Sequence, residues 1–205
     1  MATCYTAEIQ LDNVDDFIRN FNALLRSHKE NQQTHRATLG ENLVKIGCQV
    51  RQGNRQWTSS DVNVIIRWRS LQPLRRRIEQ GSVDLEKRLA AAIKQTNDED
   101  RMNELCRIPG FGPVLASTIL ALTFPEAYGV LDNASWRALQ NLGFDLSSKP
   151  YSGGGYTLSE VLKYQYLLRT LGRMTHALPA EVADALRALR RIIDGPQVSA
   201  KCHAV

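Results

Sequence analysis

The sequence predicts an all-α fold, a compact multi-helix domain of about eight or nine helices. Two kinds of observation lead to this prediction. Apolar residues recur at intervals of three and four along most of the chain, the spacing that places them on one face of a helix. Residues that cap helices, and prolines suited to a first helical turn, stand in front of several of these segments. We expect residues 1–195 to form a single domain, or two closely packed lobes, with a flexible tail over 196–205.

The N-terminal half contains segments with helical spacing and one long segment without it. Residues 30–58 are polar, rich in Gln and interrupted by glycine, with an apolar island at Leu43, Val44 and Ile46. Two alternatives stay open here, a loop with one helical piece or a loop with a short strand or two. The expected helices run from Asp12 or Asn13 to Lys29, from Asp61 to Ser70 behind a cap at Ser59 or Ser60, from Leu74 to Gln80 after Pro73, and from Asp84 to Gln95.

The C-terminal half has clearer helix boundaries. Thr157 and Glu160 have the spacing of a capping box, in which each side chain bonds the backbone N–H of the other residue. The expected helices run from Asp100 to Arg107 behind a cap at Asn97 or Asp98, from Pro113 to Thr123, from Asp132 or Asn133 to Gly143, from Thr157 to His176 after a loop over 144–156, and from Pro179 to Ile193.

Composition excludes some classes of protein. The chain has 205 residues and a formal net charge of +5, with a pI of about 9.2. It has no apolar stretch of membrane-spanning length, and its N-terminus does not resemble a signal peptide. Its four cysteines are scattered, so a disulfide framework is not expected. We therefore expect the protein to be located in the reducing cytoplasm. The basic charge is compatible with nucleic acid as a partner.

A short turn between two expected helices carries the most informative pattern. The turn is Ile108-Pro109-Gly110-Phe111-Gly112, and Pro113 follows in the first turn of the next helix. Its glycines allow backbone angles that a Cβ forbids and let another molecule approach the main chain closely. The unpaired N–H groups at the start of the next helix lie at the positive end of its dipole. The pattern therefore predicts a phosphate site.

This turn resembles the hairpin of the helix-hairpin-helix DNA glycosylase superfamily, in which a hydrophobic-Pro-Gly-hydrophobic-Gly pattern is followed by Ala, here Ala116. Asp132 lies 24 residues after Ile108, in register with the Asp of endonuclease III-like and adenine-glycosylase-like members. The resemblance implies binding of double-stranded DNA by a monomer and removal of a damaged or modified base. Asp132 would stabilise the cationic sugar. The implied DNA-binding residues are Pro109, Gly110, Phe111, Gly112 and Val114, with no cofactor beyond a monovalent cation that hairpin carbonyls can hold.

The chain also departs from that superfamily. Bifunctional members carry a Schiff-base Lys where this chain has Val114, so an active enzyme here would be monofunctional. Ala134 stands where many members have His or Asn. The cysteines are scattered, with no C-x-x-C pair, so an iron–sulfur cluster is not expected, and the four histidines have no metal-ligand spacing.

Each candidate site residue also has a structural interpretation. Asp132 is well placed to cap the helix that follows it, whether or not it takes part in catalysis. Arg75, Arg76 and Arg77 are expected either to contact DNA phosphates or to lie on a solvated helix face. Trp68 and Trp136 are interpreted as core residues, and Arg137 as structural. Two alternatives to a glycosylase remain, a non-catalytic helix-hairpin-helix DNA-binding protein and a helical interaction module.

Overall fold

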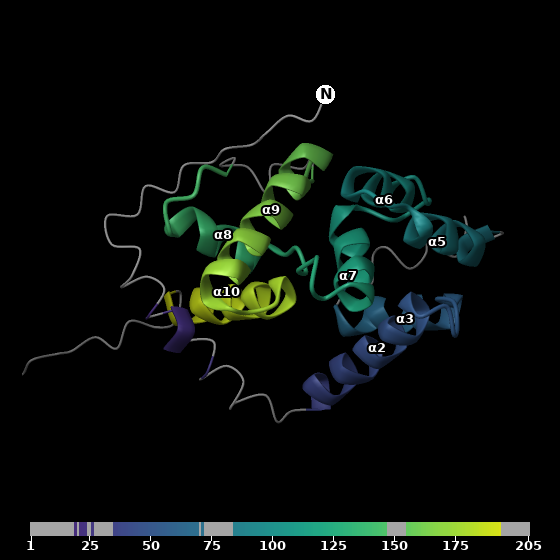
Figure 1. Cartoon of the computed structure of the whole chain (residues 1–205), viewed down its shortest axis with the longest axis horizontal. Coiled ribbons are helices and arrows are strands. Elements are labelled where there is room, and N and C mark those ends of the chain that lie inside the picture. The colour runs from purple at the N-terminus through teal and green to yellow at the C-terminus, as the bar shows by residue number, and fades with distance from the viewer. Residues whose placement is uncertain are drawn as a thin grey trace, which may run out of the picture.

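A computed structural model describes residues 19, 21–23, 26, 35–69, 71, 84–146 and 155–193. Every regular element in this part of the chain is a helix (Figure 1), so the all-α prediction is confirmed. None of the described helices is long and apolar enough to pass through a bilayer. The helices are α2 (His35–Arg51), α3 (Ser59–Trp68), α5 (Leu85–Lys94), α6 (Asp98–Cys106), α7 (Pro113–Thr123), α8 (Asn133–Asn141), α9 (Leu158–Thr175) and α10 (Pro179–Ile193).

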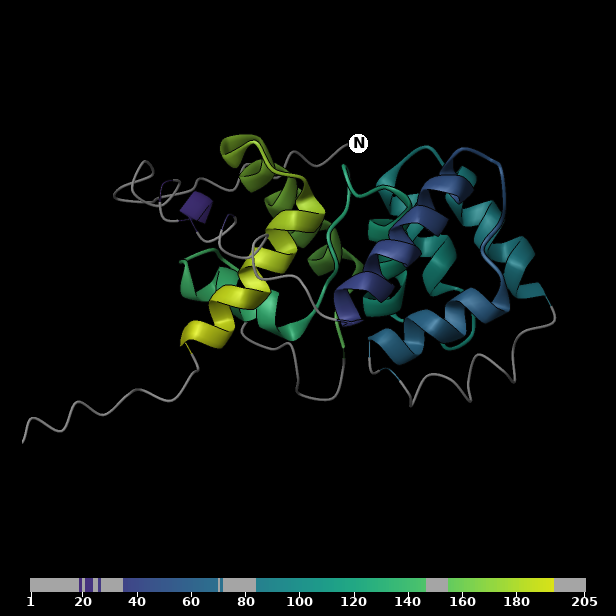
Figure 2. The ribbon, with the colours of Figure 1, turned by 90° about the horizontal axis from the view of Figure 1, so that it is seen from below.

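The helices pack in two groups that share one hydrophobic core. Helices α8, α9 and α10 form one group, and α2, α3, α5, α6 and α7 form the other (Figures 1 and 2). The groups meet where α6 packs against α9, and there Arg169 Nη1 pairs with Asp98 Oδ2 at 2.6 Å. The segment 124–132 runs between the groups and joins α7 to α8.

Helix α2 is the largest difference between prediction and structure. Most of the segment expected to be a loop, with one helical piece or short strands, is a 17-residue helix. Its apolar residues are too few to give a clear helical pattern, but Leu43 and Val50 are buried. Gly47 lies against the backbone of α7, since a Cβ there would stand 1.9 Å from the Leu122 carbonyl oxygen. Helix α2 is therefore stabilised mainly by packing against α7, which local sequence does not reveal.

Local capping sets most of the other boundaries. The expected cap at Ser59 or Ser60 is wrong by one or two residues, because Thr58 is the N-cap of α3 and forms a capping box with Asp61. The Thr157 and Glu160 capping box of α9 is confirmed. Of the two candidate caps for α6, Asn97 is the N-cap and Asp98 is the first helical residue. The extent of the last helix, Pro179–Ile193, is also confirmed.

The tryptophans behave largely as expected. Trp136 is fully buried, which confirms its assignment to the core. Trp68 is only half-buried, and it packs against the edge of the core with the Arg69 guanidinium 5.7 Å from its ring centroid. Several predictions lie outside the described residues: the helix 74–80 with Arg75, Arg76 and Arg77, most of the helix 12–29, and the tail 196–205.

Candidate functional site

The turn between α6 and α7 is fixed by a left-handed glycine and two buried side chains. Gly110 has φ +84°, a backbone conformation that favours glycine. The Phe111 N–H donates to the Ile108 carbonyl oxygen at 2.9 Å and closes the turn. The side chains of Ile108 and Phe111 are buried in the core. The two buried side chains therefore anchor the turn to the core, and Gly110 between them remains half-buried.

The N-terminus of α7 has no side-chain cap. Gly112 is the N-cap residue, with extended backbone angles of φ −101° and ψ 174°, and it offers no capping group. A Cβ built on Gly112 would meet nothing within 4 Å. Pro113 occupies the first turn, where it has no N–H to leave unpaired. This end of α7 is thus a backbone surface that an external acceptor can approach.

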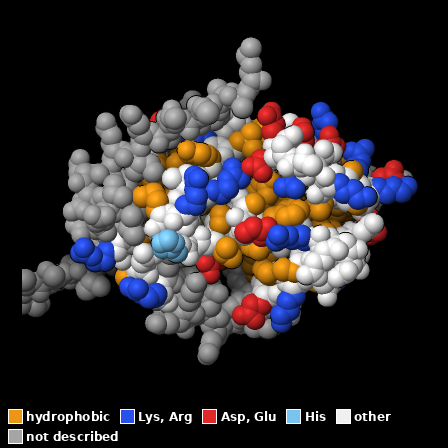
Figure 3. All heavy atoms as spheres, viewed as in Figure 1, with side chains coloured by type: hydrophobic (Ala, Val, Ile, Leu, Met, Phe, Trp, Pro, Cys, Tyr) orange, Lys and Arg blue, Asp and Glu red, His pale blue; other side chains and the backbone are white. Residues whose placement is uncertain are grey.

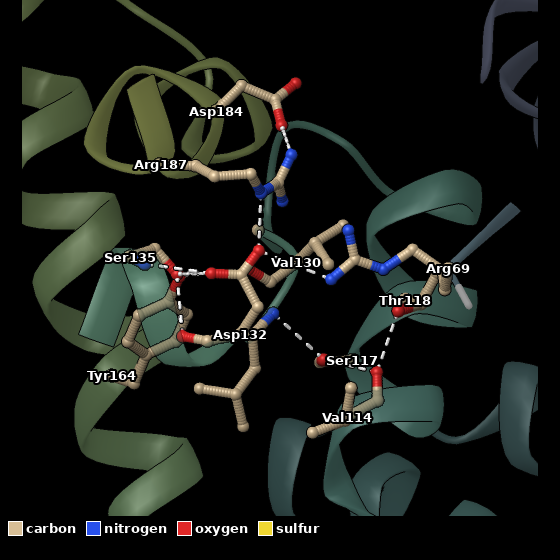
Figure 4. A network of polar contacts seen from close by, with 12 residues as sticks. Arg69, Val114, Ser117, Thr118, Val130, Asp132, Ser135, Tyr164, Asp184 and Arg187 are labelled. Carbon is tan, nitrogen blue, oxygen red and sulfur yellow. Dashed lines mark hydrogen bonds and ion pairs between the residues drawn. The ribbon is translucent and has the colours of Figure 1, made fainter. Parts of the chain in front are cut away.

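Helix α7 is hydrogen-bonded, near its start, to the segment that carries Asp132. Val114 O accepts from Ser117 Oγ at 3.0 Å and from Thr118 Oγ1 at 2.7 Å. Ser117 Oγ in turn accepts from the Leu131 N–H at 3.1 Å. The structure therefore brings Asp132 beside the start of α7 (Figure 4).

Asp132 caps α8, as its position in the sequence predicted. Its Oδ1 atom accepts from the Ser135 backbone N–H at 2.8 Å and lies 2.9 Å from Ser135 Oγ. Ser135 also lies 2.8 Å from the hydroxyl of Tyr164, which is within 3.0 Å of the Val130 carbonyl oxygen as well. Tyr164 is fully buried and stacks on Trp136 with ring centroids 6.0 Å apart. On the Oδ1 side, Asp132 is therefore connected through Ser135 to the buried aromatic pair Tyr164 and Trp136.

Two arginines bind the other carboxylate oxygen of Asp132. Arg187 Nε, from α10, lies 2.5 Å from Oδ2, and Arg69 Nη2, from the residue after α3, lies 3.3 Å from it. Arg187 also reaches Asp184 through Nη1 at 2.6 Å. The side chains of Asp132, Arg69 and Arg187 are only 17%, 9% and 21% exposed, so this ion-pair network is largely shielded from solvent (Figure 4).

The pKa shifts in this network follow from burial and charge. Burial by itself would raise the pKa of Asp132, but the charge of Arg187, the hydrogen bond from Ser135 and the charge of Arg69 outweigh it and lower that pKa. For Arg187, burial opposes the cation, yet the charges of Asp132 and Asp184 raise its pKa. Burial and repulsion from Arg187 lower the pKa of Arg69. At neutral pH the carboxylate and both guanidinium groups are charged.

No sequence pattern predicted that Arg69 or Arg187 would contact Asp132. Arg69 belongs to a basic run beside Trp68, and Arg187 lies in the middle of an amphipathic helix. Arg137, which was expected to have a structural role, is exposed and forms no ion pair with any described residue. The basic cluster expected at Arg75–Arg77 lies outside the described part of the chain.

Away from Asp132, a groove of about 800 Å³ lies between the end of α9 and the start of α10. Among its lining residues are Glu126, Tyr166, Arg169, Arg173 and His176, but neither Asp132 nor the Ile108–Gly112 turn. On the face seen in Figure 3, Lys and Arg side chains are dispersed among acidic and apolar ones. The described residues of this face therefore present separate cations and not one continuous basic patch.

In comparisons with protein families, with curated proteins and with solved structures, nothing matched the chain.

Proposed function

We propose that this protein binds the phosphate backbone of duplex DNA through the Ile108–Gly112 turn and the first turn of α7. The observation that carries the proposal is the uncapped start of α7, where Gly112 leaves open space for a ligand. Backbone N–H groups and the helix dipole favour an anion at this end of a helix. The resemblance of the turn to a helix-hairpin-helix motif supports DNA as the source of the phosphate.

The environment of Asp132 favours binding without chemistry as the principal function. A glycosylase carboxylate must face the sugar and offset the positive charge that grows there as the glycosidic bond breaks. Here Oδ1 is held by Ser135, and Oδ2 is held by Arg69 and Arg187. The negative charge of Asp132 is thus already matched by cations, which weakens its effect on an approaching sugar.

A monofunctional DNA N-glycosylase is the second candidate. It is favoured by the hydrogen bond that joins Leu131, next to Asp132, to Ser117 in α7. This contact supports the second candidate, because Asp132 follows Leu131 directly and is the carboxylate that stands in register with the turn in the sequence. Catalysis would require Asp132 to turn at least one oxygen away from the arginines and toward the sugar.

The DNA-binding proposal is tested with Gly112→Val. Because a Cβ at Gly112 meets nothing in the protein itself, the substitution should leave helicity intact and cost only the lower N-cap preference of valine, about 1 kcal/mol of stability. It should nevertheless reduce DNA affinity about tenfold or more, since the added methyl groups stand where a phosphate must approach. Fluorescence anisotropy with a labelled duplex over a range of salt concentrations measures this.

Asn141→Val is the matched control, because Asn141 is exposed at the far end of α8 and the change also adds an apolar β-branched side chain. The control should bind DNA as the wild type does. Equal affinity of Gly112→Val and Asn141→Val would show that the turn does not hold the phosphate.

The enzymatic candidate is tested with a panel of duplexes that contain uracil, alkylated or oxidised bases. Alkali-dependent strand scission would reveal abasic sites, and Asp132→Asn should abolish them because the amide keeps the cap but lacks the charge. Borohydride should trap no covalent adduct, since Val114 has no amine. If no duplex in the panel yields abasic sites, the glycosylase candidate is wrong and binding without catalysis remains the proposal.

A further inference from the structure

The two arginines on Asp132 have more donors than acceptors. Arg69 Nε and Arg187 Nη2 are buried, and neither has a hydrogen-bond partner among the described residues. Buried guanidinium N–H groups without an acceptor are costly, so such groups usually mark a missing ion, water or ligand. Through their other nitrogens, Arg69 Nη2 and Arg187 Nε, the two guanidinium groups share a single acceptor atom, Asp132 Oδ2.

The two arginines repel each other, and only the carboxylates of Asp132 and Asp184 balance their charges. Repulsion between the guanidinium groups of Arg69 and Arg187 contributes to the lowered pKa of Arg69. Asp132 and Asp184 bring the formal charge of these four side chains to zero. A phosphate offers more oxygens than Asp132 Oδ2 does, and planar guanidinium groups bind it through paired N–H groups.

The position of the network connects it to the proposed DNA surface. Leu131, the residue before Asp132, donates its N–H to Ser117 Oγ of α7, and that hydroxyl donates to the Val114 carbonyl oxygen in the first turn of the helix. The exposed parts of Asp132 and Arg187 give an anion a route to the site.

We propose that Arg69 and Arg187 form a second binding site for a backbone phosphate of DNA, which the Asp132 carboxylate occupies as an internal acceptor in the unbound protein. This inference rests on the proposed function for the source of the phosphate. On binding, the guanidinium groups exchange Asp132 Oδ2 for phosphate oxygens, and Oδ1 keeps its hydrogen bonds to Ser135. No proton is transferred and no bond is broken. Asp132 thus weakens DNA binding by competing for the same cations.

The first arm of the test uses inorganic phosphate and needs no DNA. Asp132→Asn keeps an oxygen for the Ser135 cap but removes the competing charge. We expect phosphate to raise the melting temperature of this variant more than chloride at equal ionic strength does. The double variant Asp132→Asn/Arg187→Gln should lose that response. Equal responses to the two salts in Asp132→Asn would overturn the anion site.

The second arm measures duplex binding. Removing any acidic residue should strengthen the binding of a polyanion. The reference is therefore Asp145→Asn, which removes the same charge from a fully exposed side chain beyond the far end of α8. We expect Asp132→Asn to bind DNA about tenfold more tightly than Asp145→Asn, the gain from roughly one charge-assisted hydrogen bond. The slope of log affinity against log salt should steepen by about 0.9, for one further phosphate.

Asp184→Asn provides an independent variant if Asp132→Asn does not fold. Asp184 is more exposed than Asp132, and its removal frees Arg187 Nη1 while leaving the cap of α8 untouched. It should also bind DNA more tightly than Asp145→Asn. Affinity equal to that of Asp145→Asn in every foldable variant would overturn the proposal.

The two arms separate this proposal from the proposed function. If no variant binds DNA but Asp132→Asn responds to phosphate through Arg187, the anion site is supported and its assignment to DNA is overturned together with the proposed function. If DNA binding depends on Gly112 but not on Asp132 or Asp184, the proposed function stands and the second phosphate site is wrong.

Discussion

Gly47→Ala tests the packing that holds the proposed DNA-binding helix, α7. An added Cβ would stand 1.9 Å from the Leu122 carbonyl oxygen and 2.5 Å from its carbon. Ordinary contact begins near 3.4 Å, so the two helix backbones must separate by about 1.5 Å in a close-packed core. Such overpacking costs about 1–3 kcal/mol or more, whereas alanine gains at most about 1 kcal/mol in helix propensity. We expect a net loss of about 2 kcal/mol, measured by urea unfolding followed by circular dichroism.

Gly40→Ala is the matched control for this prediction, because it makes the same change in the same helix. Its Cβ would lie 3.2 Å from Cζ2 of Trp68, the far edge of a half-buried side chain that can shift slightly. The helix-propensity gain should therefore dominate, and stability should stay level or rise by up to about 1 kcal/mol. If the two variants are equally stable, the close crossing of α2 and α7 is wrong.

Three further predictions follow from buried polar groups. The depressed pKa of Asp132 gives stability that is complete above its ordinary value of 3.8 and is lost as the pH falls through the lower folded value. As the pH is lowered, the free energy of unfolding should therefore decrease more steeply for the wild type than for Asp132→Asn. Parallel curves of unfolding free energy against pH would contradict this prediction. The Gln165 side chain hydrogen-bonds both the N–H and the carbonyl oxygen of Gly129, at 2.9 and 2.8 Å. Gln165→Leu leaves both backbone groups unsatisfied and should lower the free energy of unfolding in urea by about 2–4 kcal/mol. A loss below about 1 kcal/mol would count against unsatisfied backbone groups as the cause. Burial raises the pKa of the Cys106 thiol to about 11, so peptide mass spectrometry should find slow alkylation of Cys106 near neutral pH, whereas rapid labelling there would show an accessible thiolate.

The amino-acid sequence determined the features that depend on neighbours within about one helical turn. The caps at Asn97 and Thr157 and the first residue of α10 were predictable because each involves only the residues next to it. Asp132 was predicted as the cap of α8 for the same reason. The all-α class followed from these local signals together.

Tertiary structure alone decided which distant residues meet. Helix α2 is poor in apolar residues and depends on the contact of Gly47 with α7, which no local pattern encodes. Arg69 and Arg187 stand 118 residues apart in the sequence, and only the packing of the two helix groups brings them onto Asp132. The sequence therefore identified a carboxylate that caps a helix. The fold determined that this carboxylate is held between two cations, because long-range electrostatic contacts form only after the core has placed their helices.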